Sequence, residues 1–412
     1  MHPHRTSRTA RWRLALAAVI VGSLAVTASV ALGSTASSKA TTITALIGSS
    51  GPAETYAVKN AASAWSKQTG IPVNVVVASD LGQQLAQGFA SGNPPDIFYL
   101  GNDQVATYAK AGDLASLDNL KNVKSFYPSL REAYTYKGHL YAAPKDFSTL
   151  ALVVNTASWK GAHLTAKDYP KTWKQLAAVA KKLTRNGQVG LCTNPEFHRL
   201  GVFMLQAGGW LVSKDGKTAT VNSKANVAAF NFVKSMLKNG SMKLTNQLGV
   251  GWGGEGFGKK MCAMTIEGNW IAGAMKADYP TVGWKAVELP TGPAGKGTLQ
   301  YDGGWGLAQA SKNKADAMAL ITYLTQTKVE MGNAKAFGVM PSVMADRKIW
   351  SKTYPQYAAF LASADYSKSI PPVPNIATVL GDFNQQLQGL PNTDPKTILN
   401  RINSELQSIL NQ

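Results

Sequence analysis

From Thr42 onward, short β-branched segments alternate with amphipathic ones, and this alternation constrains the fold more than any other feature of the chain. Pro52 and Gly70 bracket the first amphipathic segment as helix start and stop signals. Strands are predicted over residues 41–48, 71–78 and 94–101, and helices over 51–70, 81–92 and 103–112. Strands and helices in this order predict an α/β fold with a parallel core.

A second set of elements follows residues 140–156, an extended run that we expect to carry the chain out of a first lobe. Further helices are predicted over 172–187, 223–240, 313–327, 373–390 and 394–410, and strands over 188–194, 261–268 and 298–310. About 375 residues remain after the leader described next, which exceeds what one hydrophobic core usually organises. No low-complexity linker separates the two sets, so a hinge with more than one strand crossing is expected.

The N-terminus has the pattern of a secretory leader. Four arginines precede the apolar run at 14–32, and small residues follow it. Residues 1–36 are therefore predicted to be a signal peptide cleaved after Ala36 or Ala40, although the run is long enough to act as an uncleaved membrane anchor instead. Either outcome places the protein outside the cell or in the cell envelope.

The charge balance is strongly basic. The formal net charge of +19 falls to +15 without the four leader arginines. The cations are scattered and lysine dominates, which is not typical of nucleic-acid readers, so no nucleic-acid partner is expected. A solvated basic surface, an anionic envelope polymer and an acidic ligand all remain compatible with this charge.

Cys192 and Cys262 are the two cysteines of the chain. Export makes a disulfide between them possible, and closing the loop of about 70 residues would stabilise the fold by roughly 4 kcal/mol. Two cysteines and scattered histidines do not predict a metal site.

Nucleotide chemistry is not expected. Gly249, Gly251 and Gly254 match a dinucleotide-binding pattern, but no strand leads into them and later glycines should prevent the helix that would receive a pyrophosphate. No nucleophile elbow is present either. Hydrolysis of a glycosidic bond needs only two carboxylates, so the pair Glu255 and Glu267, or the pair Asp103 and Asp146, keeps a hydrolase open as an alternative.

Four tryptophans stand beside glycines: Trp210, Trp252, Trp270 and Trp305. Such neighbours suggest loops in which an indole face stays free, and a free indole face packs well on the C–H surface of a sugar ring. The alternative is that each ring merely fills a lobe surface. Trp270 is the most informative, because it follows the strand ending at Glu267, and ligands bind outside strand ends in open α/β sheets.

Five segments in this order resemble the extracellular solute-binding proteins of sugar ABC importers, of the maltose/maltodextrin-binding kind: residues 67–77, 91–118, 138–156, 251–270 and 334–342. The resemblance implies a type II periplasmic-binding-protein-like fold with a ligand cleft between two lobes. The lobes would comprise residues 41–147 with about 304–345, and 148–303 with about 346–412. It also implies a monomer that binds a mono- or oligosaccharide, without catalysis or cofactor, and delivers it to membrane permease subunits driven by a separate ATPase.

The resemblance also implies the ligand-binding residues. Trp270 matches the family's sugar-stacking tryptophan, and Asp103 matches the acid that bonds sugar hydroxyls. The full set of expected ligand-binding residues is Glu54, Asp103, Asp146, Ser148, Glu196, His198, Trp252, Glu267, Trp270, Gly304 and Trp305.

Two departures from the family pattern matter. Ser34 stands where related proteins carry a lipid-anchored cysteine, so a lipid anchor is not expected. Residues 374–383 lack an additional stacking tryptophan, which makes a long maltodextrin a less suitable ligand. Besides a sugar-binding protein and a hydrolase, the basic charge suggests a third possible function, an envelope adhesin that holds anionic polymers.

Overall fold

The computed structural model describes residues 42–49 and 51–412, and the predicted signal peptide lies outside them. The strands are β1 Ile43–Ile47, β2 Val73–Val77, β3 Ile97–Gly101, β4 Thr135–Tyr136, β5 His139–Leu140, β6 Ala142–Thr149, β7 Ala151–Asn155, β8 Val189–Thr193, β9 Met242–Leu244, β10 Cys262–Glu267, β11 Trp284–Val287, β12 Thr298–Leu307 and β13 Ser367–Lys368. The helices are α1 Pro52–Thr69, α2 Leu81–Ala90, α3 Asn102–Ala111, α4 Pro128–Ala133, α5 Thr156–Gly161, α6 Trp173–Leu183, α7 Phe197–Gln206, α8 Lys224–Lys238, α9 Thr245–Leu248, α10 Gly253–Gly258, α11 Ile271–Asp278, α12 Lys314–Leu324, α13 Thr327–Phe337, α14 Arg347–Thr353, α15 Ala358–Ser363, α16 Ile376–Gln388 and α17 Pro395–Leu410.

Two sheets organise these elements. The first has the order β13-β12-β3-β1-β2, with β6 paired to β12, and the second has the order β11-β7-β10-β8-β9. Parallel pairs form one side of each sheet, β3-β1-β2 in the first and β10-β8-β9 in the second. Strand β12 runs antiparallel to β3 and β6 but parallel to β13, and β7 runs antiparallel to β10 and β11. The predicted parallel core is therefore present with antiparallel strands added to it.

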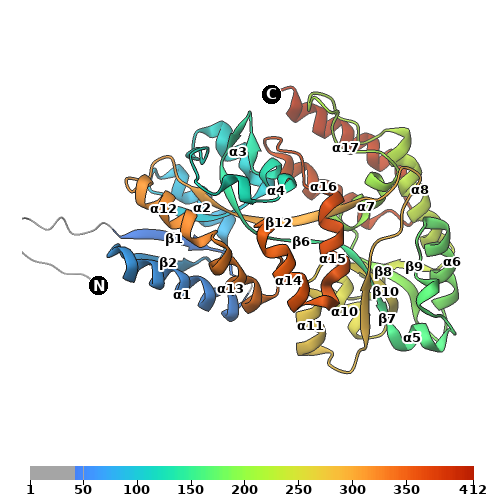
Figure 1. The fold of residues 1–412 in the computed structure, drawn as a ribbon. Helices are drawn as coiled ribbons and strands as arrows, with labels where there is room; N and C mark the ends of the chain where they lie inside the picture. Colours follow the sequence, from blue (N-terminus) through green and yellow to red (C-terminus); the bar gives the residue numbers. More distant parts are fainter. Residues whose placement is uncertain (1–41, 50) are drawn as a thin grey trace, which may run out of the picture. The chain divides into compact units, whose positions relative to one another are not determined.

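The extended run predicted over residues 140–156 forms two consecutive strands that belong to different sheets. β6 pairs with β12 in the first sheet, and β7 begins at Ala151 in the second. In Figure 1, β6 and β12 lie between the elements of the two sheets. Strand β12 also connects two cores, since its Leu299 packs in one hydrophobic cluster and its Trp305 in another.

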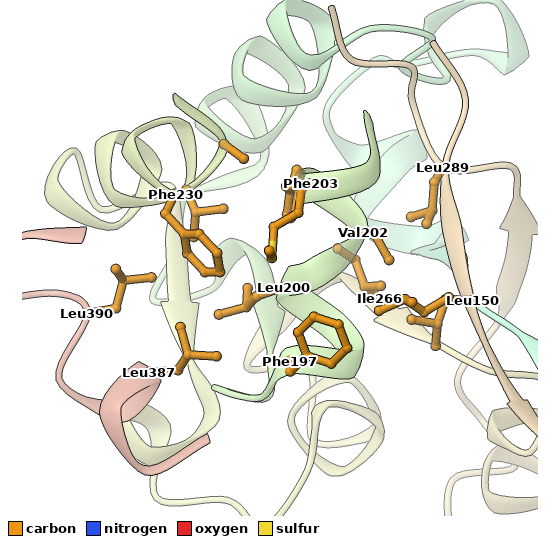
Figure 2. Packing of buried hydrophobic residues seen from close by; sticks show 14 of the residues in the cluster. Leu150, Phe197, Leu200, Val202, Phe203, Phe230, Ile266, Leu289, Leu387 and Leu390 are labelled. Carbon is orange, nitrogen blue, oxygen red and sulfur yellow. The ribbon is translucent and has the colours of Figure 1, made fainter. Parts of the chain in front are cut away.

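Each sheet buries its own hydrophobic cluster. The cluster around the second sheet joins β7, β8 and β10 to α6, α7, α8, α16 and α17, and Figure 2 shows Phe197, Leu200, Phe203 and Phe230 packed together there. The cluster around the first sheet joins β1 and β3 to α1, α3 and α12. The described residues form one compact unit, so the lobe boundaries given above remain a prediction.

Sequence patterns correctly predicted α1, α2, α3, α6, α8, α12, α16 and α17 but missed α7 and α13. They also missed the helix at Gly253–Gly258, which the glycines were expected to prevent. These glycines are needed because neighbours press against the helix. A Cβ at Gly253 would lie 2.5 Å from Thr265 Oγ1, and one at Gly258 would lie 2.3 Å from the Tyr279 ring.

Candidate functional site

Strand β10 delivers polar and aromatic groups at its end. It terminates at Glu267, and a turn then places Trp270 at the start of α11. The Trp270 indole Nε1 donates to Glu267 Oε2 at 3.0 Å. A Cβ at Gly268 would lie 2.2 Å from the indole ring, so glycine is required for the ring to lie against its own turn. The orientation of Trp270 is thus fixed by a hydrogen bond and by close packing.

Ser148 is hydrogen-bonded to the turn that leads to Trp270. Its Oγ accepts a hydrogen bond from the Asn269 backbone N–H at 3.0 Å, and the Asn269 side-chain amide donates to the Gly338 carbonyl at 2.6 Å. Both Ser148 and Asn269 are buried. Ser148, predicted as a ligand contact, therefore helps to position the Trp270 turn in this structure.

Arg199, in the first turn of α7, links the side chains around Trp270. Its Nη2 donates to Glu267 Oε2 at 2.7 Å, and its Nη1 contacts both Glu196 and the Tyr301 hydroxyl. The guanidinium lies 5.4 Å from the Trp270 ring and 5.3 Å from the Tyr301 ring, which is cation–π range. One buried cation therefore organises two acids and two aromatic rings.

Three aromatic rings meet at this point. Trp270 and Tyr301 are 4.8 Å apart edge to face, and His198 lies 4.7 Å from Tyr301. Trp270, His198 and Tyr301 are all partly exposed residues. We call Glu196, His198, Arg199, Glu267, Trp270 and Tyr301 the aromatic group.

A second cluster, the carboxylate group, comprises Glu54, Tyr99, Lys145 and Asp146. The Lys145 ammonium lies 3.4 Å from Glu54 Oε1, contacts Asp146 Oδ2, and sits 4.1 Å above the Tyr99 ring. Glu54 lies in the first turn of α1 and Asp146 lies on β6. Elements distant in sequence thus bring two acids to one lysine.

One short segment of β12 contacts both groups. The Tyr301 side chain belongs to the aromatic group, and the Gly303 backbone N–H bonds the Asp146 carboxylate of the carboxylate group. Between them, Asp302 accepts hydrogen bonds from Tyr134 at 2.9 Å and from Asn102 at 3.4 Å. Residues 301–303 therefore connect most of the predicted ligand-binding residues.

Burial and charge set the protonation states here. Burial raises the pKa of Glu267, and the neighbouring Arg199 opposes this shift. Burial likewise raises the pKa of Asp146, and Lys145 opposes that shift. Burial also lowers the pKa of His198 to about 4, so its imidazole is neutral at physiological pH. A neutral imidazole can both donate and accept hydrogen bonds.

Asp103 and Trp252 are two further predicted ligand-binding residues. Asp103 is partly exposed in the first turn of α3, where its carboxylate accepts backbone N–H groups of residues 103 and 104. Trp252 is partly buried and lies across Gly254, where a Cβ would be 2.0 Å from the ring. The next residue, Gly253, abuts Glu267, since a Cβ there would be 2.7 Å from Oε1.

Trp305 and Gly304, also predicted as ligand contacts, are both buried in this structure. Trp305 is 1% exposed and packs edge to face on Tyr99 with the ring centroids 4.6 Å apart. Gly304 is buried, and a Cβ there would lie 2.8 Å from Tyr134. The glycines beside Trp305 make room for neighbouring aromatic rings and do not leave the indole face free.

Sequence reasoning missed Arg199, Tyr301 and Lys145. Arg199 stands three residues after Glu196 at a helix start, where an ion pair is geometrically favoured. Tyr301 alternates with Asp302 on a strand, so their side chains point to opposite faces. Lys145 directly precedes the predicted Asp146.

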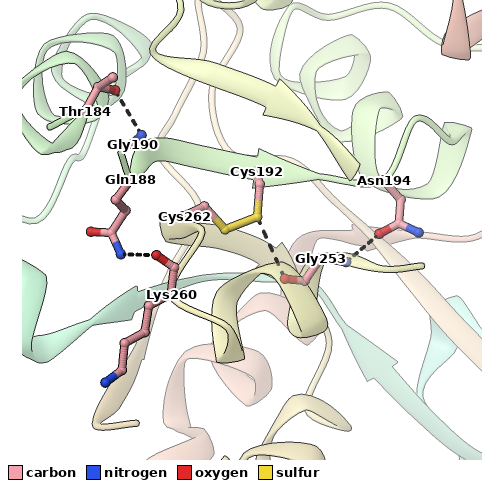
Figure 3. The surroundings of a disulfide bond; sticks show 8 residues. All are labelled: Thr184, Gln188, Gly190, Cys192, Asn194, Gly253, Lys260 and Cys262. Atoms are coloured by element: carbon pink, nitrogen blue, oxygen red, sulfur yellow. Dashed lines mark hydrogen bonds between the residues drawn. A yellow bond between two sulfur atoms is a disulfide. The ribbon is translucent and has the colours of Figure 1, made fainter. Parts of the chain in front are cut away.

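A disulfide joins Cys192 on β8 to Cys262 on β10, as Figure 3 shows. These neighbouring strands lead to the two ends of the aromatic group, since β8 precedes Glu196 and β10 ends at Glu267. Gly256 of α10 packs on the bond, because a Cβ there would lie 3.3 Å from Cys192 Sγ. The disulfide thus fixes the strands that carry the site.

A separate hollow of about 780 Å³ lies between α4, the loop at 208–216 and the segment 367–372. Trp210 lines it, with the Lys368 ammonium 4.3 Å from its ring. None of the predicted ligand-binding residues lines this hollow.

Comparison with known proteins identifies the family. The sequence model of the bacterial extracellular solute-binding proteins matches residues 60–362, well over half of the chain. The chain belongs to this family. Within the described residues, no helix is both long and apolar enough to cross a bilayer.

One curated relative is the diacetylchitobiose-binding protein DasA of Streptomyces coelicolor, which is 28% identical over 273 residues. That match spans 63% of each of the two chains. Among solved structures, the GacH receptor of Streptomyces glaucescens aligns with a TM-score of 0.78 at 21% identity, covering 90% of this chain and 98% of that one. The sugar-binding protein MalE of Xanthomonas citri aligns with a TM-score of 0.79 at 19% identity, covering 90% and 98%. These neighbours establish the type II periplasmic-binding-protein fold, as predicted.

Proposed function

We propose that this solute-binding protein captures a mono- or oligosaccharide and delivers it to the permease subunits of an ABC importer. The observation that carries the proposal is the aromatic group, in which Trp270, Tyr301 and His198 meet two acids and an arginine at strand and helix ends. Ring faces suit the C–H surfaces of a sugar, and the charged groups suit its hydroxyls. The relatives support this choice, since DasA is named for a chitin disaccharide and MalE for sugar binding.

Within this proposal the site residues have different roles. Trp270, Tyr301 and His198 would stack on the ligand, while Glu196, Arg199, Asp103 and Asp146 would bond its hydroxyls. Buried Glu267 would act indirectly, because its Oε2 already accepts from Arg199 and from Trp270. Glu54 and Trp252 would complete the rim.

The protein would bind its ligand without consuming it. A glycosidase needs two carboxylates flanking one scissile bond. Here Glu255 is engaged by Lys259 at 2.6 Å and by the Gly251 N–H at 2.8 Å, and buried Glu267 is paired with Arg199. Both acids of this pair are therefore already engaged by cations.

Calorimetry with chito-, malto- and galacto-oligosaccharides tests the proposal. At least one sugar should bind, with no new reducing ends released over a day. Trp270→Ala should weaken that binding about tenfold, since ring stacking contributes roughly 1 kcal/mol beyond burial. Trp210→Ala, which removes a tryptophan from the separate hollow, is the matched control and should bind normally. Sugar turnover by the wild type, or equal losses in the two variants, would contradict the proposal.

A further inference from the structure

The outer surface of α5 and α6 carries a dense, unneutralised positive charge. Between Lys160 and Arg185 the sequence holds seven lysine and arginine residues and a single acid, Asp168. All seven cations are exposed, and none of them forms an ion pair with any residue in the described part of the chain. Two exposed lysines elsewhere in the described residues pair with acids, Lys259 with Glu255 and Lys296 with Glu288.

The helix geometry gathers these cations on one side. The inward face of α6 buries Leu176, Val179, Ala180 and Leu183. Lys174 and Lys181 are seven residues apart, so they share the opposite, outward face, about 10 Å apart along the axis. The helix lies so close to β8 that a Cβ at Gly190 would be 1.9 Å from the Ala180 carbonyl oxygen. The direction of this charged face is therefore rigidly set.

Helix α5 continues the same surface. The Arg185 guanidinium reaches Gly161, where a Cβ would lie 2.8 Å from Nη2, and this brings Arg185 next to Lys160. Tyr169 packs on Trp159 of α5 at 5.0 Å and has the Lys285 ammonium 5.7 Å from its ring. We call the resulting surface the basic face; its cations are six of these seven, namely Lys160, Lys167, Lys174, Lys181, Lys182 and Arg185.

The chemistry of this face indicates its partner. Lysines are point charges that attract phosphate without demanding one bond geometry. The large apolar side chains exposed in the described residues lie elsewhere, at Tyr56, Val76, Val77, Met344 and Ile349, so the basic face offers none to insert into lipid. A row of cations spaced along a helix suits a linear chain of phosphates better than one small anion.

We propose that the basic face binds a linear phosphate-containing polyanion of the cell envelope. This binding is independent of the sugar site, whose residues lie on other elements. It would hold the protein near the cell surface through many weak, salt-sensitive contacts, because each neutralised phosphate releases counterions.

Binding of the purified protein to long-chain polyphosphate at increasing salt tests this proposal. The test variant changes Lys174, Lys181, Lys182 and Arg185 to Gln. The control variant changes Lys67, Lys110, Lys121 and Lys124 to Gln. These four lysines are exposed and lie near the first sheet, so the control variant loses the same amount of charge as the test variant. The test variant should lose at least tenfold in affinity near 0.1 M salt. The slope of its log affinity against log salt concentration should be shallower by about 3, at roughly 0.7 per lost phosphate contact.

Unchanged melting temperatures and sugar affinity would show that both variants are folded. Equal losses in the two variants would overturn the proposal in favour of a general charge effect. Binding to phosphatidylglycerol vesicles but not to polyphosphate would overturn it in favour of a membrane partner.

Discussion

Replacing Arg199 by Met should be among the most damaging single changes near the site, because it leaves a buried acid without its cation. Glu267 is fully buried, and Arg199 provides its closest charge at 2.7 Å. Removing one partner of a buried ion pair typically costs about 3–5 kcal/mol, since the remaining charge is uncompensated. We expect the free energy of unfolding at pH 7.5 to fall by about that amount.

The double variant Arg199→Met with Glu267→Met separates this cause from simple loss of packing. With both charges replaced by apolar groups of similar size, at least half of the lost stability should return. Urea unfolding followed by circular dichroism measures each variant of the cycle. Glu267→Met alone is the fourth corner and should also destabilise, because it leaves Arg199 with fewer partners.

The pH dependence gives a second check on the same pair. Burial raises the pKa of Glu267, and losing Arg199 should raise it further. A protonated Glu267 no longer carries an unpaired charge, so the deficit of Arg199→Met should shrink as the pH falls. A loss below about 1 kcal/mol, or a double variant no more stable than Arg199→Met, would refute the reasoning.

Three further predictions concern other parts of the fold. Asp346 is fully buried with neither carboxylate oxygen hydrogen-bonded, and burial raises its pKa to about 6. The protonated form of Asp346, which stabilises the fold, is lost as the pH rises through 6. In urea titrations, Asp346→Asn should therefore raise the unfolding free energy by about 1–3 kcal/mol at pH 7.5 and change it little at pH 4. Equal effects at the two pH values would exclude titration of Asp346 as the cause. Replacing Cys192 and Cys262 together by Ala should lower the unfolding free energy by roughly 4 kcal/mol, as expected for opening a loop of 70 residues, and dithiothreitol should then have no further effect on the variant. Gly268→Ala should displace the Trp270 ring, since the new Cβ would fall 2.2 Å from it, and calorimetry should show about tenfold weaker sugar binding; unchanged affinity would mean that the ring position does not matter.

The fold was largely predictable because its signals are local. The alternation of strands and helices, and stop signals such as Gly70 and Gly112, mark elements that the structure contains. The short helix at 253–258 was missed because glycine normally opposes helix formation. Its reason is tertiary, since side chains of β10 and Tyr279 leave no room for a Cβ.

The site was only partly predictable because its contacts are distant in sequence. Trp270 could be proposed from a strand end, but Arg199 reaches Glu267 across 68 residues and Tyr301 across 102. Glycines beside a tryptophan proved ambiguous. At Trp270 the glycine lets the ring lie on its own turn, whereas at Trp305 the glycines accommodate Tyr134 and Phe98 around a buried strand.

The central claim is that a sugar packs on Trp270 in the aromatic group. The most direct measurement is the indole N–H resonance of Trp270 in ¹⁵N-tryptophan-labelled protein, assigned with Trp270→Phe, during titration with the sugar that binds best. We predict a large shift for Trp270 that saturates with binding, and little change for Trp210. Binding that leaves the Trp270 resonance unmoved while Trp210 shifts would contradict the account and place the ligand in the separate hollow.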